Sequence, residues 1–340
     1  MIVIPIENQY AYDSIPRNRD LKYHIPNHCD APSRVLVVDW KGDCFVCSCE
    51  AWLPVAVGKI TDFANLADVW QSPTARKLQA DIDTGTFTHC AVDRCGVMDQ
   101  SIINNQYLVS INVDESCNLA CPSCRKEPIM ITSGPIFDRK LAQVNHMVDI
   151  LEKFDQPCRV IMSGNGDPLA SAIMRPLIHR WRPRSNHSVR LFTNGLLLKK
   201  QLPDSPILDH VQEYFISIDA GSQPVYERVR LGGSWAKLIE NFDWLSTQVQ
   251  RKPARVLLML VLQRDNYTDV NNFCELVVRY GFEGSITYLE DWGTWDNFLE
   301  QDVIGNSQHR FHDQALKELT NCYQQFHTRI NFGSKLRQLI

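Results

Sequence analysis

Three cysteines stand close together in the segment C-N-L-A-C-P-S-C, where Cys117, Cys121 and Cys124 follow the spacing C-x3-C-x2-C. Three soft thiolates on one tight loop are typical ligands of an iron–sulfur cluster. A four-iron cluster has four iron corners, so three protein ligands leave one iron open to a further ligand. Zinc is the alternative, but zinc sites favour C-x2-C pairs with a fourth ligand nearby, and none follows in this loop. The spacing therefore favours an iron–sulfur cluster.

Small and polar residues follow the later apolar runs of the chain. In the segment S-G-N-G-D-P at 163–168, small residues let the backbone approach a ligand, and Asp167 supplies a carboxylate. In the segment S-I-D, Ser217 and Asp219 point to one face because side chains alternate along a strand. These segments are candidates for binding a small polar ligand.

The elements that must position these residues alternate between two patterns. Short apolar runs predict strands, and helical stretches separate them, so the sequence predicts a parallel sheet of right-handed βαβ units. Six units rather than eight predict an α/β fold of the partial (β/α)6 TIM-like barrel type, with its chemistry at the C-terminal ends of the strands. The predicted strands are 107–113, 158–163, 189–193, 214–219, 256–262 and 285–289, and the predicted helices are 138–154, 169–180, 235–250 and 269–280.

The cysteines are unevenly distributed, because six of the 12 precede residue 96. The N-terminal part has little periodic apolar pattern beyond a hairpin with its turn at Gly42 and a helix over 66–80, so metal crosslinks would supply stability that its thin core lacks. The sequence predicts a small cysteine-rich cluster-binding domain at 1–105, a barrel at 106–290 and a helical extension at 291–340.

Composition excludes several classes of protein. With 35 basic and 39 acidic residues the net charge is −4, which disfavours a nucleic-acid binder. No run approaches the roughly 18 apolar residues that span a bilayer, and the N-terminus does not resemble a secretory signal. We expect a soluble cytoplasmic protein with no nucleic-acid or membrane partner, whose clustered thiols are metal ligands rather than disulfides.

The three-cysteine spacing and the ordered strand-end segments resemble the radical S-adenosylmethionine (SAM) superfamily over about residues 107–290. The resemblance implies a 4Fe–4S cluster on Cys117, Cys121 and Cys124, with SAM bound at the open iron. It also implies reductive cleavage of SAM to methionine and a 5′-deoxyadenosyl radical that abstracts hydrogen from a substrate. The implied SAM-binding residues are Ser163, Gly164, Asn165, Gly166, Asp167, Pro168, Asn194, Ser217, Asp219 and Arg230.

The N-terminal cysteines resemble the SPASM or shorter twitch domain, which carries auxiliary iron–sulfur clusters and normally follows the barrel rather than preceding it. The resemblance implies one auxiliary 4Fe–4S cluster, and Cys44 and Cys49 compete with Cys47 for the hairpin position. A zinc site of four cysteines is the alternative. The implied auxiliary ligands are Cys29, Cys47, Cys90 and Cys95.

By resemblance, the substrate is expected to be a ribosomally synthesised precursor peptide, changed by epimerisation, crosslinking or backbone rearrangement. The expected partners are that peptide, a separate protein that recognises its leader, and an electron donor of flavodoxin or ferredoxin type. Two alternatives stay open: a radical SAM enzyme acting on a small molecule or protein side chain, and an inactive electron-transfer or structural protein. Cys322 is a weak candidate for a catalytic hydrogen donor, and a core thiol is the alternative.

Overall fold

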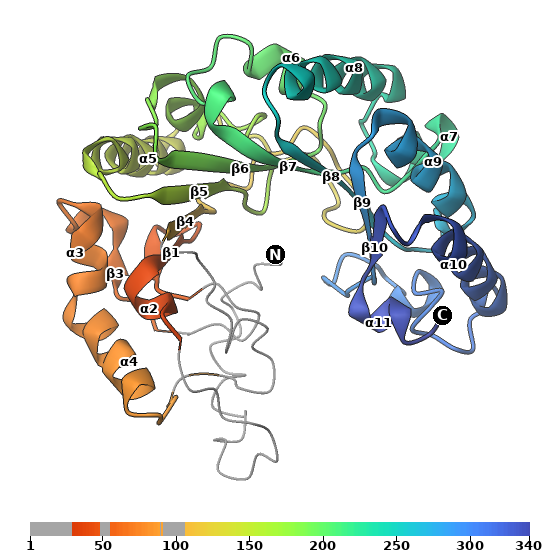
Figure 1. Cartoon of the computed structure of the whole chain (residues 1–340), viewed down its shortest axis with the longest axis horizontal. Helices are drawn as coiled ribbons and strands as arrows, with labels where there is room; N and C mark the ends of the chain where they lie inside the picture. Colours follow the sequence, from red (N-terminus) through yellow and green to blue (C-terminus); the bar gives the residue numbers. More distant parts are fainter. Residues whose placement is uncertain (1–28, 48–54, 89, 91–105) are drawn as a thin grey trace. The chain divides into compact units, whose positions relative to one another are not determined.

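The computed structural model describes residues 29–47, 55–88, 90 and 106–340 (Figure 1). The chain divides into two compact units, and the division falls within one strand, His187–Thr193. The first unit holds Met1–Glu115, Ile131–Gly166 and Ala172–Val189, and the second holds Ser116–Met130, Asp167–Ser171 and Arg190–Ile340.

The first unit contains the opening βαβ element that the sequence predicts. Strands β4 (Tyr107–Ile111) and β5 (Cys158–Met162) pair in parallel, and helix α5 (Pro135–Lys153) connects them. The helix begins at a proline, which lacks the N–H that the first turn leaves unused. Both strands are almost entirely buried, as expected for apolar strands with both faces covered.

An N-terminal hairpin extends the same sheet. Strands β1 (Val35–Val38) and β2 (Asp43–Phe45) are antiparallel, and Gly42 takes the positive φ of +81° in their turn. Strand β3 (Gly58–Lys59) pairs with β2. The sequence predicts this hairpin but not its place, because β1 also pairs in parallel with β4. The strand order in this unit is β5-β4-β1-β2-β3.

Short helices complete the first unit. The predicted helix over 66–80 is two helices, α3 (Leu66–Gln71) and α4 (Pro73–Asp83), because Ser72 between them is extended. The Ser72 hydroxyl accepts a hydrogen bond from the Ala75 N–H and caps α4. The remaining helical pieces are α2 (Ala31–Arg34) and a 3-10 turn at Ile60–Asp62.

The second unit continues the alternation of strands and helices. Its strands are the part of β6 (the His187–Thr193 strand) from Arg190 onward, and then β7 (Val211–Ser217), β8 (Arg255–Val261), β9 (Glu283–Thr287) and β10 (Ile330–Phe332). The pairs β7–β8, β8–β9 and β9–β10 are parallel. Its α-helices are α6 (Leu198–Gln201), α7 (Gln223–Val229), α8 (Trp235–Arg251), α9 (Val270–Tyr280), α10 (His312–Phe326) and α11 (Ser334–Arg337). Its 3-10 turns are Leu208–His210, Tyr267–Asp269 and Phe298–Glu300.

The six predicted barrel strands are confirmed with small shifts at their ends, and the fold is a mixed α/β sheet of mostly parallel strands. One predicted helix is wrong. Of residues 169–180 only Pro176–Arg180 is helical, as a short π-helical turn, because a proline inside a helix removes a hydrogen bond and clashes with the preceding turn. No helix in the described ranges is both long and apolar enough to cross a membrane.

Candidate functional site

The cysteine loop, residues 116–130 of the second unit, is closed by its own backbone. The Cys117 N–H donates to the Ile129 carbonyl at 2.7 Å, and the Cys124 N–H donates to the Cys121 carbonyl at 2.8 Å. The Ala120 N–H donates at 3.0 Å to the carbonyl of Leu231, which follows α7. The loop is therefore held in shape and tied to the segment after α7.

The three thiols of the loop lie within electrostatic reach of one another. Cys121 is buried, Cys117 is half-buried and Cys124 is exposed. The pKa of the Cys117 thiol is raised to about 11, chiefly by burial, and the nearby Cys121 thiol acts in the same direction. Burial also raises the pKa of Cys121, and Cys124 acts in the same direction. Three thiols on one short loop suit a cationic metal core, which holds coordinating thiols deprotonated.

Each sulfur of the loop accepts a hydrogen bond from a different side chain. The distances exceed those of N–H···O bonds because sulfur is larger. The pairs are Asn194 Nδ2 to Cys117 Sγ at 3.9 Å, Arg230 Nη1 to Cys121 Sγ at 3.5 Å, and Arg125 Nη2 to Cys124 Sγ at 3.6 Å. The sequence identified Asn194 and Arg230 as candidates and missed Arg125, which follows the third cysteine directly.

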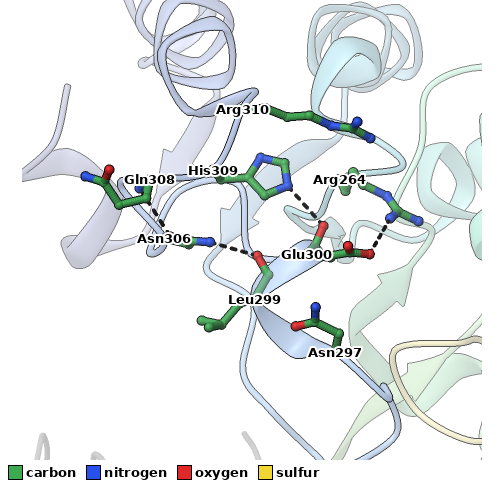
Figure 2. Close-up of a pocket in the computed structure, with 8 residues that line it drawn as sticks. All are labelled: Arg264, Asn297, Leu299, Glu300, Asn306, Gln308, His309 and Arg310. Atoms are coloured by element: carbon green, nitrogen blue, oxygen red, sulfur yellow. Dashed lines mark hydrogen bonds and ion pairs between the residues drawn. The ribbon is translucent and has the colours of Figure 1, made fainter.

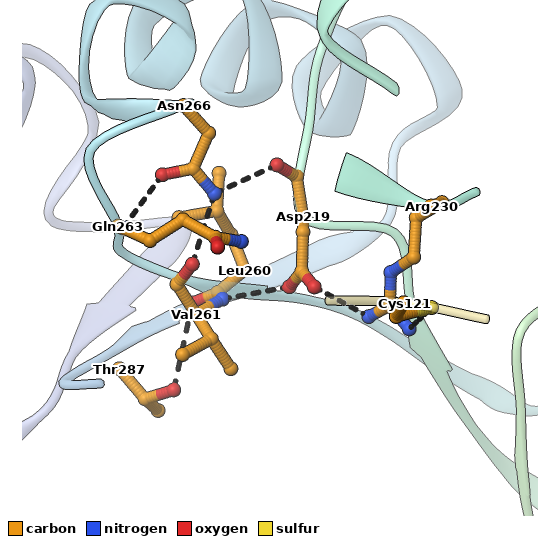
Figure 3. Close-up of polar contacts among 8 residues, drawn as sticks. All are labelled: Cys121, Asp219, Arg230, Leu260, Val261, Gln263, Asn266 and Thr287. Carbon is orange, nitrogen blue, oxygen red and sulfur yellow. Dashed lines mark hydrogen bonds and ion pairs between the residues drawn. The ribbon is translucent and has the colours of Figure 1, made fainter. Parts of the chain in front are cut away.

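Arg230 also forms a buried ion pair with Asp219 (Figure 3), at 2.8 Å between Nη2 and Oδ2. Asp219 follows β7 and has a φ of +55°, an unusual value for a residue other than glycine that often marks a functional position. Its second carboxylate oxygen accepts a hydrogen bond from the Val261 N–H, and Asn266 Nδ2 donates to its backbone carbonyl. Burial raises the pKa of the Asp219 carboxyl, and the Arg230 guanidinium opposes that shift.

Both carboxylate oxygens of Asp167 accept hydrogen bonds from residues of the second unit. One carboxylate oxygen accepts from the Thr193 hydroxyl at 2.8 Å and the Asn194 N–H at 2.7 Å, and the other accepts from the Leu169 N–H at 2.9 Å. Burial raises the pKa of this carboxyl, and the N–H and O–H donors oppose the shift. The carboxylate therefore fixes the start of the loop after β6.

The Ser163–Gly166 segment of the first unit packs tightly against the end of β4. The Ser163 hydroxyl donates to Asn112 Oδ1 at 2.6 Å. Gly164 has a φ of +135°, and a Cβ added there would lie 3.1 Å from the Asp114 carbonyl oxygen. Any other residue would adopt a strained backbone conformation here, and its Cβ would crowd a backbone carbonyl. Glycine is therefore required at this position. Asn112, a polar residue after an apolar strand, was not singled out from the sequence.

Buried polar atoms near Arg230 and Asp219 find no hydrogen-bond partner among the described residues. They are Arg230 Nε, Tyr226 Oη and the Nε2 atom of Gln263, a residue only 1% exposed. Buried donors normally have partners, so these atoms suit a polar ligand at this end of the strands. The three thiols, their N–H donors and these atoms fit a cluster with a polar cosubstrate.

The N-terminal cysteines are described in part. Cys29 and Cys47 are buried and Cys90 is partly exposed, whereas Cys49 and Cys95 lie outside the described residues. Cys44 lies within β2, and complete burial raises the pKa of its thiol well above the ordinary value. In the described ranges, no three His, Cys, Asp or Glu side chains are grouped so as to hold one metal ion. A four-iron cluster binds each cysteine through a different iron and does not require that grouping.

Cys322, the candidate hydrogen donor, lies on α10 and is 1% exposed. It forms a hydrogen bond with Cys274 of α9, and this bond lowers the pKa of Cys322 and raises that of Cys274. Helices α9 and α10 pack against each other. This placement matches the core-thiol alternative.

A surface pocket of about 360 Å³ lies between the loop after β8 and the segment that precedes α10 (Figure 2). Arg264 reaches Glu300 in an ion pair at 3.5 Å, and His309 uses both ring nitrogens to hold the local backbone. The sequence did not predict this pocket. Its lining residues are Arg264, Asn297, Leu299, Glu300, Asn306, Gln308, His309 and Arg310.

Comparison with solved structures gives similarities at low identity. SuiB from Streptococcus suis bound to S-adenosylmethionine is 12% identical, with 78% of this chain and 55% of that chain covered and a TM-score of 0.44. The structure anSMEcpe with AdoMet and the Cp18Cys peptide is 14% identical, with 67% and 63% covered and a TM-score of 0.43. A radical SAM methyltransferase from Sphaerobacter thermophilus is 13% identical, with 68% and 67% covered and a TM-score of 0.39. The chain thus spans little more than half the length of SuiB.

Family models assign both parts of the chain, although no curated protein matches it. The model described as the radical SAM superfamily matches residues 111–277, and the SPASM model, described as an iron–sulfur cluster-binding domain, matches residues 29–96. The predicted fold class and domain order are confirmed, and the two domains imply a SAM-binding 4Fe–4S cluster and an auxiliary cluster. The chain is a radical SAM superfamily protein whose SPASM domain precedes the barrel domain.

Proposed function

We propose that Cys117, Cys121 and Cys124 hold the 4Fe–4S cluster at which this enzyme cleaves SAM reductively, in order to modify a ribosomally synthesised peptide. The observation that carries the proposal is the set of three thiols in mutual electrostatic reach, each with its own N–H donor. When bound, the cluster would supply the electron for breaking the sulfonium carbon–sulfur bond of SAM, which is the chemistry that hydrogen abstraction from the substrate requires.

The residues of the chain bind and orient the cosubstrate. The Ser163–Gly166 segment offers backbone groups without intervening side chains, and its glycine requirement at Gly164 supports close approach of a ligand. Arg230 Nε is a buried donor available to an anionic group such as a carboxylate. Ser217 at the end of β7 and Asp219 just beyond it stay proposed SAM contacts.

Two predicted SAM contacts receive a revised role in this proposal. Asp167 serves as a positioning residue, because three donors already occupy its carboxylate. Asn194 is similarly fixed, since its side chain contacts Cys117 and donates to Asn118 Oδ1 at 3.0 Å. These two residues align the loop after β6 with the cysteine loop. Pro168 follows Asp167 in the turn after β5.

We keep Cys29, Cys47, Cys90 and Cys95 as the proposed ligands of the auxiliary cluster. Cys44 lies inside β2, whereas Cys47 lies beyond the end of that strand, and this difference in position supports Cys47 over Cys44 as the hairpin ligand. The domain borders at 105/106 and 290/291 likewise remain proposals.

The SPASM domain supports a peptide substrate by family resemblance. A separate leader-binding protein and an electron donor of flavodoxin or ferredoxin type complete the proposed system. Mass spectrometry of peptides encoded beside the gene, after incubation with the reduced enzyme and SAM, identifies the product by its mass change.

The test of the proposed function is SAM cleavage by the full chain after anaerobic reconstitution. We expect 5′-deoxyadenosine from the reduced wild-type protein and none from the Cys117→Ala/Cys121→Ala/Cys124→Ala triple variant. Cys274→Ala, which removes a buried thiol from α9, is the matched control and should retain activity. Undiminished 5′-deoxyadenosine formation by the triple variant would refute the assignment.

A further inference from the structure

The three N–H···S contacts come from side chains of different chemistry and burial. Arg230 brings a cationic guanidinium whose side chain is only 12% exposed, and it contacts the buried Cys121. Arg125 brings the same group to Cys124, which is exposed to solvent. Asn194 brings a neutral amide to Cys117 at the longest of the three distances. The Arg230 contact should have the strongest electrostatic effect, because charge interactions weaken with solvent exposure.

Arg230 is held in place by its surroundings. Its N–H bonds to the Tyr226 carbonyl at 2.8 Å at the end of α7, and the Leu231 carbonyl beside it accepts from Ala120 of the cysteine loop. Asp219 fixes the guanidinium from the other side at 2.8 Å. The neighbouring Asp219 carboxylate and Cys121 sulfur raise the pKa of Arg230 although burial opposes this, so the side chain is a cation.

Reduction adds one electron and thus one negative charge to an iron–sulfur cluster. Hydrogen bonds to the cysteine sulfurs and nearby positive charge stabilise the more negative form, and both are known determinants of cluster potential. A negative carboxylate nearby acts in the opposite direction. The surroundings of the three cysteines therefore contain two cationic donors, one neutral donor and two opposing carboxylates, Asp219 near Cys121 and Asp167 near Cys117.

We propose that Arg230, Arg125 and Asn194 set the reduction potential of the cluster on the cysteine loop, with Arg230 dominant and Asp219 as its counter-charge. The electron comes from the flavodoxin- or ferredoxin-type donor, and no bond forms or breaks in this step. The inference rests on the proposed cluster and assigns Arg230 and Asp219 an influence that precedes SAM binding. These four side chains affect the electron transfer through their charges and hydrogen bonds, without reacting themselves.

The test is a redox titration of the reconstituted full chain without SAM, followed by electron paramagnetic resonance. The signal of this cluster is the one that the triple cysteine variant lacks, which separates it from the auxiliary cluster. At the ambient potential that half-reduces the wild type, Arg230→Gln should lower the ratio of reduced to oxidised cluster about tenfold, equivalent to about 59 mV for one electron. Arg230→Lys keeps the positive charge but loses the planar guanidinium with its several N–H donors, and should lower the ratio by less.

Two further variants keep the test decisive if Arg230→Gln does not fold. Arg125→Gln should lower the same ratio by about threefold, because Cys124 is exposed. Asp219→Asn should raise it, because an opposing negative charge is removed. Arg264→Gln removes an arginine of the same unit that pairs with Asp265 and Glu300 rather than with a cysteine, and should leave the ratio unchanged.

The outcomes separate this inference from the proposed function. A wild-type signal that persists in the triple cysteine variant refutes the cluster assignment itself. A signal that is lost in the triple variant, yet titrates identically in Arg230→Gln, Arg125→Gln and Asp219→Asn at full iron content, refutes the tuning role alone. A rise of the ratio in Arg230→Gln contradicts the predicted sign.

Discussion

The backbone N–H of Asn194 donates a hydrogen bond of 2.7 Å to the carboxylate of Asp167, which lies 27 residues earlier in the chain. Through this bond the turn that follows β5 holds the end of β6. The side chain of Asn194 in turn contacts Cys117 and Asn118 of the cysteine loop. Asp167 therefore acts on the candidate cluster indirectly, through the orientation of Asn194.

Asp167→Asn should destabilise the protein by about 1–3 kcal/mol, because an amide cannot accept from all the donors that face this buried carboxylate. The measurement is anaerobic chemical denaturation. Asp204→Asn, on an exposed loop, should change the free energy of unfolding by less than about 0.5 kcal/mol. If both variants unfold like the wild type, Asp167 does not hold the loop.

The pH dependence of stability can be tested at Asp39 in the N-terminal hairpin. Its carboxylate accepts hydrogen bonds from the Lys41 and Asp43 N–H groups, and burial raises its pKa in the folded state. The folded state then holds this proton to higher pH than the unfolded state, so the wild type loses stability as pH rises through the raised pKa.

Asp39→Asn keeps an acceptor for both N–H groups and removes the titration. Relative to the wild type, the variant should gain unfolding free energy as the pH is raised from about 4 to about 7. Parallel denaturation series at several pH values measure this difference. A constant difference across that range would show that the carboxyl titrates alike in both states.

Metal content tests the auxiliary site. Reconstituted wild-type protein should contain about eight irons per chain for two four-iron clusters, and zinc at the N-terminal site would reduce this to about four. Cys47→Ala should also reduce it to about four, whereas Cys44→Ala should leave it unchanged. Loss of iron in Cys44→Ala but not in Cys47→Ala would show that Cys44, and not Cys47, is the cluster ligand.

Cys322→Ala tests whether that thiol supplies a hydrogen atom. Because Cys322 is buried against Cys274, we expect unchanged 5′-deoxyadenosine and peptide product, with a stability loss of about 1 kcal/mol for the smaller side chain. Product mass and deuterium incorporation provide the measurement. A folded variant that cleaves SAM but accumulates unfinished peptide product would restore the catalytic role.

The sequence predicts the barrel strands well because each is a short apolar run with buried residues, such as Val189 and Leu191 in β6. It misses β10, whose three residues Ile330–Phe332 are too short to show a pattern, and which forms only by pairing with β9. It also misses the pairing of β1 with β4, since contact between distant segments leaves no periodic signal. Local pattern therefore predicts the elements but not their neighbours.

The candidate site shows the same division. The cysteine spacing and strand-end segments predict the proposed ligand set, because several candidate residues lie within one short stretch. The N–H···S contacts of Arg125 and Arg230 and the occupied carboxylate of Asp167 depend on tertiary geometry. Arg125 directly follows the third cysteine, and a charged residue beside a cysteine motif is a signal that the sequence itself contains.

The parallel pairing of β1 with β4 limits how modular this protein can be. Truncation at the proposed 105/106 border would strip β4, a completely hydrogen-bonded inner strand, of one neighbour and leave its amides open to another chain. The isolated barrel domain should therefore self-associate, and removal of the cysteine-rich part would damage the strand that leads into Cys117. The cysteine-rich domain and the barrel domain are joined by the backbone hydrogen bonds between β1 and β4. Neither domain can therefore be exchanged between relatives as an independent unit.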